Sequence, residues 1–207
     1  MWQWQDPFTA VLHSRDQRSL SRSFERQLQR HDRPHVVASA SPAEVREGLS
    51  RDAVGWRKQA KQGDAIARLR IPRLGVTEIV VNGTDTNSLK RGPGRYLGTA
   101  MPGENELVYI AGHRTTYGAP FARIDRLREG DRVFVELPYG TIEYAVTTHR
   151  IVPADQLSVL KSKGVEELAL QACHPRFFAS HRYIAYAEPV GVTLPGSSEQ
   201  TPLERSA

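Results

Sequence analysis

This chain of 207 residues contains only one cysteine, Cys173. A single thiol cannot form an internal disulfide, and it excludes cysteine-rich metal frameworks. His174 and His181 lie near it, but their spacing matches no standard zinc pattern, so the sequence predicts no metal site. Cys173 is therefore either a small buried hydrophobic residue or a nucleophile activated by its neighbours.

The sequence also lacks a run of about 20 apolar residues that would span a bilayer, and it has no signal-peptide core. Two tryptophans in the segment 1–5 are typical of a membrane interface, and we expect a spanning segment upstream of them. The net charge of +5 comes from 28 basic and 23 acidic residues that form no block, so the sequence predicts no nucleic-acid partner.

Between residues 63 and 191 the hydrophobic pattern is mainly that of β-strands. Short segments alternate apolar and polar residues or are apolar throughout, and turn residues such as Asn82 and Gly83 separate them. Many short strands at regular spacing predict a closed β-barrel. The expected strands are 65–71, 77–81, 107–111, 133–137, 142–146, 168–173 and 183–187.

The rest of the chain predicts appendages to this barrel. Apolar residues at helical spacing predict one helix over 9–31 and a second that starts at Ser41 with a capping box and ends at Gly63. We assign 1–62 to an N-terminal helical appendage, 63–191 to the β-barrel domain and 192–207, rich in Ser, Pro and Glu, to a disordered tail.

Three residues with reactive side chains lie at predicted strand ends. Cys173 ends one strand, Arg182 begins the next, and His113 follows the strand 107–111. A free thiol has a pKa near 8.5 and is mostly protonated at neutral pH, whereas a nearby cation stabilises its thiolate. Arg176 is a rival to Arg182, but Arg182 opens a strand, which fixes its direction.

Three motifs together resemble the sortase family, in particular its class E branch. They are the segment 111–121 around His113, the segment Ala169–Cys173 and the trailing Arg182, and the resemblance extends over about residues 64–191. It implies an eight-stranded sortase barrel and a catalytic triad of Cys173 as nucleophile, His113 as acid and base, and Arg182 at the oxyanion. No cofactor is implied.

The resemblance also implies partners and a location. A sortase cleaves a C-terminal Leu-Pro-x-Thr-Gly or Leu-Ala-x-Thr-Gly type signal of a surface protein and transfers the protein to an amine of the cell wall or a pilin. It acts at the outer face of the bacterial membrane, held by an N-terminal anchor. Two other functions remain open: a cysteine hydrolase on the same scaffold and a non-catalytic barrel that binds peptides.

The chain departs from the family at the cysteine motif. The family pattern is Thr-Leu-x-Thr-Cys, whereas Ala169 and Ala172 stand here in place of both threonines. This change removes a hydroxyl near the substrate or the arginine, and it makes Ala172 a candidate substrate-binding position. Tyr117, four residues after His113, is the other candidate, and packing within its own loop is an equally good explanation.

Asp6-Pro7-Phe8 has two interpretations. Pilin-type sortases carry an Asp-Pro-aromatic lid, so Asp6 could pair with Arg182 while Phe8 covers Cys173. Asp-Pro is also a common helix start, with Asp6 as the cap and Pro7 in the first turn. About 55 residues separate this motif from the barrel, and we therefore favour the helix start.

Overall fold

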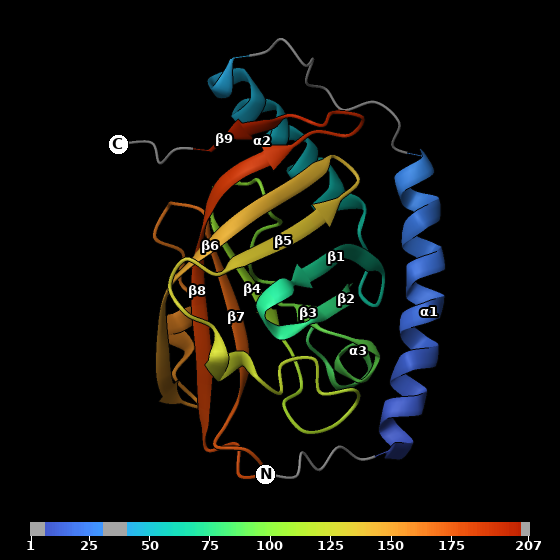
Figure 1. Ribbon diagram of the computed structural model, residues 1–207, viewed down its shortest axis with the longest axis vertical. Helices are drawn as coiled ribbons and strands as arrows, with labels where there is room; N and C mark the ends of the chain where they lie inside the picture. Colours follow the sequence, from blue (N-terminus) through green and yellow to red (C-terminus); the bar gives the residue numbers. More distant parts are fainter. Residues whose placement is uncertain (1–6, 31–40, 204–207) are drawn as a thin grey trace.

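The computed structural model describes residues 7–30 and 41–203. Figure 1 shows a strongly curved sheet with helix α1 along its side and α2 over one end. The helices are α1 (Pro7–Arg30), α2 (Pro42–Gln59) and α3 (Thr86–Arg91), with 3-10 turns at η1 (Pro72–Leu74), η2 (Ile124–Arg126) and η3 (Leu157–Leu160). The strands are β1 (Ala65–Ile71), β2 (Val76–Asn82), β3 (Gly94–Arg95), β4 (Leu107–Ala111), β5 (Arg132–Leu137), β6 (Gly140–Pro153), β7 (Glu167–His174), β8 (His181–Thr193) and β9 (Gln200–Pro202).

The strands close into a barrel. They follow the order β6-β5-β1-β2-β3-β4-β7-β8-β9, and a further pairing of β6 with β8 joins the two sides. Eight strands thus form the ring, with β9 added to β8, which confirms the predicted closed eight-stranded barrel. Most neighbours are antiparallel, but β2 pairs with β3 and β4 pairs with β7 in parallel. The carboxyl ends of β4 and β7 therefore lie at the same end of the barrel.

Alternation along the strands separates the inside of the barrel from its outside. Val133, Val135 and Leu137 of β5 point inward and are buried, and Ile142 and Tyr144 of β6 pack in the same core. Burial of each large apolar side chain contributes about 1.5–3 kcal/mol. Because the pattern has period two, this core fixes which residues of each strand face outward.

Helix α2 closes one end of the barrel. The predicted capping box is present: the Glu44 N–H donates to Ser41 Oγ, and the Ser41 N–H donates to the Glu44 carboxylate over 2.8 Å. Leu49, Ala53 and Trp56 are buried in the barrel core, and Trp56 Nε1 donates to the carbonyl of Ile66 over 3.1 Å.

Helix α1 lies against the outside of β1 and β2, and its span agrees with the helix predicted over 9–31. Leu20 and Phe24 pack on Ala65, Ile79 and Val81. In the part of the chain that the structure describes, no helix has both the length and the apolar character needed to cross a bilayer.

The prediction of a disordered tail over 192–207 is wrong for its first part. Strand β8 continues to Thr193, β9 pairs with Gly191–Thr193, and Leu203 is buried in the core. The composition of the segment did not predict β9, because Thr201 is its only residue that favours a strand. The strand forms because it pairs with β8, which is a long-range contact.

Candidate active site

Cys173 and Arg182 face each other across two antiparallel strands. Cys173 is the last residue but one of β7, Arg182 is the second of β8, and the two are register partners. Side chains directly opposite in such a pair lie on the same face, with Cβ atoms about 5 Å apart. Both residues are half-buried, so the thiol and the guanidinium can reach the same bound group at the surface.

The parallel pairing of β4 with β7 places His113 beside this pair. Ala111 is the register partner of Gln171, and the Gly112 N–H donates to the Gln171 carbonyl over 2.9 Å. His113 and Cys173 each lie two residues beyond this matched pair. The three residues predicted as catalytic therefore come from adjacent strand ends at one end of the barrel.

The surroundings of His113 disfavour its charged form. The imidazole is half-buried, and burial together with the nearby His13 of α1 lowers its pKa. Thr116 Oγ1 lies 3.4 Å from His113 Nδ1, and the Tyr117 ring lies 5.1 Å from the imidazole between centroids. The ring is thus held from its own loop, and Tyr117 is placed to pack on His113.

Arg182 is oriented by main-chain carbonyls. Its Nη1 donates to Ala179 O over 2.7 Å and to His181 O over 3.0 Å. No carboxylate of the described ranges 7–30 and 41–203 forms an ion pair with it. An arginine held by neutral oxygens keeps donor groups available for an anion.

A cavity of about 230 Å³ extends from Arg182 along the outer face of β4 and β7. Tyr109 and Ala111 of β4 and Gln171 of β7 form its floor, and the segment 153–160 forms one wall. These residues lie on the same face as Cys173, since they alternate with inward-facing core residues. The cavity can take an extended chain next to Arg182.

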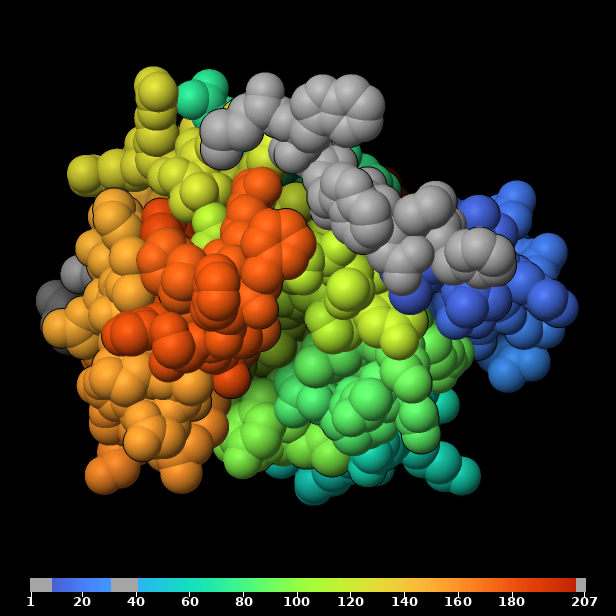
Figure 2. Space-filling view, turned by 90° about the horizontal axis from the view of Figure 1, so that it is seen from below, coloured from blue at the N-terminus to red at the C-terminus, as the bar shows by residue number. Residues whose placement is uncertain are grey.

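The other predicted positions have different surroundings. Ala172 is fully buried in the barrel core, so its methyl group forms no part of the surface, and its assignment to substrate binding is corrected. Its neighbour Gln171 lines the cavity instead. Arg176 donates through Nη2 to the carbonyl of Ala122, which ties the β7–β8 loop to the loop after β4. Figure 2 shows these two segments side by side at this end of the molecule.

The lid interpretation concerns Asp6, which lies outside the described residues, and Phe8, whose side chain is not described. Helix α1 begins at Pro7, as the alternative interpretation of Asp6-Pro7 expects. The lid remains a prediction. Within the described ranges there is also no cluster of three or more histidine, cysteine, aspartate or glutamate side chains that could hold a metal ion.

Sequence reasoning missed Arg114. This side chain is buried, and its Nη1 donates to Cys173 O over 3.2 Å and contacts His174 Nδ1 at 2.9 Å. Its Nη2 pairs with Asp125 at 2.8 Å. Burial lowers the pKa of Arg114, and Asp125 opposes that change. The side chain thus connects the His113 loop to the Cys173 strand end, and its position directly after His113 was the only signal in the sequence.

We expect Arg114→Ala to lower the free energy of unfolding by about 1–3 kcal/mol, because it leaves buried hydrogen-bonding groups without a partner. It should also disorder the end of β7, so an alkylating reagent will label Cys173 at an altered rate. Chemical denaturation and timed labelling measure the two effects. Arg132→Ala is the matched control, since Arg132 is an exposed arginine paired with Glu143 on the barrel surface. Equal stability of both variants would contradict the bridging role.

A closed barrel with a thiol, an arginine and a histidine at one end is the arrangement expected of a β-barrel cysteine enzyme. A sequence model of the Sortase domain matches residues 69–190. This match covers more than half of the chain, and the chain belongs to the sortase family. The resemblance inferred from the three motifs is thereby confirmed.

Individual relatives agree with this assignment. Sortase D of Bacillus subtilis is 34% identical over 132 residues, which cover 62% of this chain and 65% of that protein. Sortase SrtE1 of Streptomyces coelicolor is 32% identical over 177 residues, 75% of this chain and 50% of that protein. The solved structure of a Clostridium perfringens Sortase D5 transpeptidase has a TM-score of 0.66 at 24% identity and covers 85% of this chain and 99% of its own, which supports the fold. This chain thus spans about half to two thirds of the length of the two curated relatives.

Proposed function

We propose that this protein is a cysteine transpeptidase that cleaves a sorting signal and transfers the acyl part to an amine. The observation that carries the proposal is the pairing of Cys173 with Arg182 beside the strand end that bears His113. Membership of the sortase family supports the same reaction class. The family also implies action at the cell surface, on the outer face of the membrane.

In the first half of the reaction, the Cys173 thiolate attacks the carbonyl carbon of the scissile peptide bond. Negative charge moves onto the carbonyl oxygen, where Arg182 donates charge-assisted hydrogen bonds. The carbon–nitrogen bond then breaks, and His113 as imidazolium gives its proton to the leaving amine. A thioester on Cys173 remains.

In the second half, neutral His113 takes a proton from the incoming amine as its nitrogen attacks the thioester. The sulfur leaves as thiolate, Arg182 again stabilises the oxyanion, and a new amide bond is complete. The signal is of the Leu-Pro-x-Thr-Gly or Leu-Ala-x-Thr-Gly type, and the acceptor is an amine of a cell-wall precursor or a pilin lysine. The cavity beside Arg182 supports binding of such an extended peptide.

A labelled signal peptide, incubated with and without an amine acceptor, tests the proposal. Ligation that depends on the amine supports transfer, whereas cleavage without a ligated product, at the same rate with and without the amine, identifies a hydrolase. If no thioester is found on Cys173 by mass spectrometry, the barrel is a peptide-binding protein. Peptides with proline or alanine at the second signal position compare the two signal types.

The pH dependence of kcat/KM should be bell-shaped, because the mechanism needs a thiolate and an imidazolium in the same molecule. The pKa of His113 lies below the ordinary value of 6.5. The limb that reports His113 therefore lies at lower pH than an unperturbed histidine would give. Initial rates over a pH series measure the profile. A rate that rises without a maximum up to pH 10 would count against His113 as the acid.

A further inference from the structure

Three polar side chains on one face of α1 contact the barrel near His113. Thr9, His13 and Gln17 follow one another at intervals of four residues, so they lie on the same face of the helix. Gln17 bonds both main-chain groups of Ile79: it accepts from the N–H over 2.7 Å and donates to the carbonyl over 3.1 Å. Gln17 thus fixes the position of α1 along its axis relative to β2.

The other two side chains hold the loop that follows His113. The N–H of Tyr117 donates to Thr9 Oγ1 over 3.1 Å. The His13 ring lies directly against Gly118, where an added Cβ would be only 2.3 Å from His13 Cδ2. Helix α1 therefore packs against the outer side of this loop, although the two segments are more than 100 residues apart in the sequence.

The loop needs such external support. Tyr117, Gly118 and Ala119 all have positive φ, at 49°, 71° and 43°. Two of them carry side chains, and a non-glycine residue in this region costs of order 1–3 kcal/mol. A strained segment persists only where its surroundings determine its shape, and Thr9 and His13 supply part of those surroundings.

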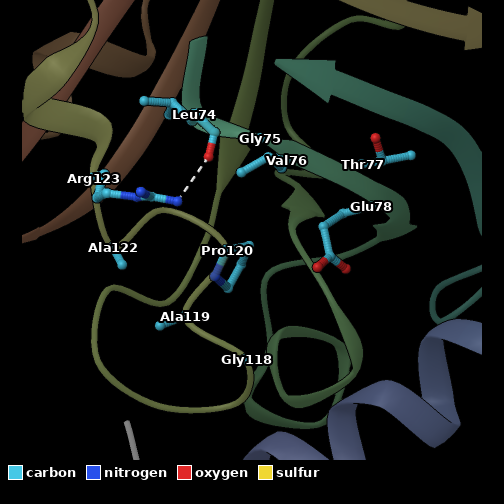
Figure 3. Close-up of a pocket in the computed structure, with 10 residues that line it drawn as sticks. All are labelled: Leu74, Gly75, Val76, Thr77, Glu78, Gly118, Ala119, Pro120, Ala122 and Arg123. Atoms are coloured by element: carbon cyan, nitrogen blue, oxygen red, sulfur yellow. Dashed lines mark hydrogen bonds between the residues drawn. The ribbon is translucent and has the colours of Figure 1, made fainter. Parts of the chain in front are cut away.

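His13 is itself fixed from the barrel. Its Nε2 lies 3.0 Å from Glu78 Oε2 of β2, and the histidine side chain is only 5% exposed. Figure 3 shows Glu78 pointing from β2 towards the loop of Gly118 and helix α1. The titratable groups near His13 include Glu78 on β2 and His113 on the loop. The ammonium group of Lys90 on α3 lies 5.9 Å from the centroid of the Tyr117 ring.

We propose that His13 is a positioning residue of the active site, which together with Thr9 holds the loop 113–119 and so sets the place of His113. Helix α1 is then a working part of the catalytic unit and not only a stabilising appendage. This inference rests on the acid–base role proposed above for His113. The effect of His13 on the pKa of His113 agrees with their proximity.

The test compares His13→Ala, His13→Gln and Leu12→Ala in the full chain. Leu12 neighbours His13 but is 56% exposed, so Leu12→Ala controls for changes to the helix itself. His13→Gln retains a donor that can reach Glu78. We expect His13→Ala to lower kcat about tenfold with KM within about twofold of the parent, a pattern of lost transition-state positioning. His13→Gln should recover most of the loss, and Leu12→Ala should match the parent.

A second measurement does not depend on activity. The His113 ring is followed by NMR during a pH titration, with His113→Gln identifying its signal. His13→Ala should raise the pKa of His113 and broaden the amide signals of Tyr117 and Gly118. Unchanged His113 and loop signals in a folded His13→Ala protein would overturn the inference and leave the proposed function intact. Full transfer activity of His113→Gln would overturn the proposed role of His113 instead.

Discussion

Cys173→Ala is expected to abolish the acyl-enzyme and all peptide transfer. Every step of the proposed reaction passes through the sulfur, so no other group of the site can replace it. The side chain is half-buried at a strand end, and its truncation should change the midpoint of thermal unfolding by only a few degrees. Mass spectrometry after incubation with a signal peptide measures the adduct.

Cys173→Ser is the companion variant, because it keeps the shape of the site and changes only the nucleophile. A hydroxyl has a far higher pKa than a thiol, so this variant should also form no adduct within the time of the assay. Peptide binding should survive in both variants and can be followed by fluorescence anisotropy. Transfer that persists in Cys173→Ala would require a different mechanism.

Arg182→Ala is expected to lower kcat about 100- to 1,000-fold, the usual effect of losing one oxyanion donor. The hydrogen bonds described for the Arg182 side chain go to two nearby main-chain carbonyls, those of Ala179 and His181. The barrel should therefore remain folded, and circular dichroism checks this.

Arg176→Ala is the matched control for Arg182→Ala. Arg176 also follows Cys173, but its guanidinium donates to Ala122 O in the neighbouring loop. We expect a loss of less than about tenfold from it, because it acts on the loop and not on the oxyanion. The reverse order of the two losses would transfer the oxyanion role to Arg176.

The strands of the barrel were predictable because each is indicated by the hydrophobic pattern of its own short segment. Period-two alternation and short apolar runs predicted seven of the observed strands, although β6 and β8 extend beyond their predicted ends. The capping box at Ser41 marked the start of α2. Adjacent strands joined by a short loop also predicted that Cys173 and Arg182 would be close, which agrees with their register.

What the sequence did not reveal depends on contacts between distant segments. Nothing near Arg114 indicates that it bonds the Cys173 carbonyl, since that contact needs the parallel pairing of β4 with β7. The approach of His13 to Gly118 joins residues that are far apart in the chain. Alternation along β7 already predicts that the Ala172 side chain points into the barrel. The comparison with the threonine motif considered only the missing hydroxyl and not the direction of the side chain.

Strand β8 pairs with β6, β7 and β9, and it also carries Arg182. The residue proposed to stabilise the oxyanion is thus part of the strand that completes the ring. During synthesis the first 170 or so residues can emerge without a functional catalytic end, because neither the thiol nor its arginine is in place until the last strands are made. Such long-range pairing is slow to form. The growing chain therefore has no assembled pair of Cys173 and Arg182 until its barrel closes, and the proposed transfer activity is expected only once the last strands have folded.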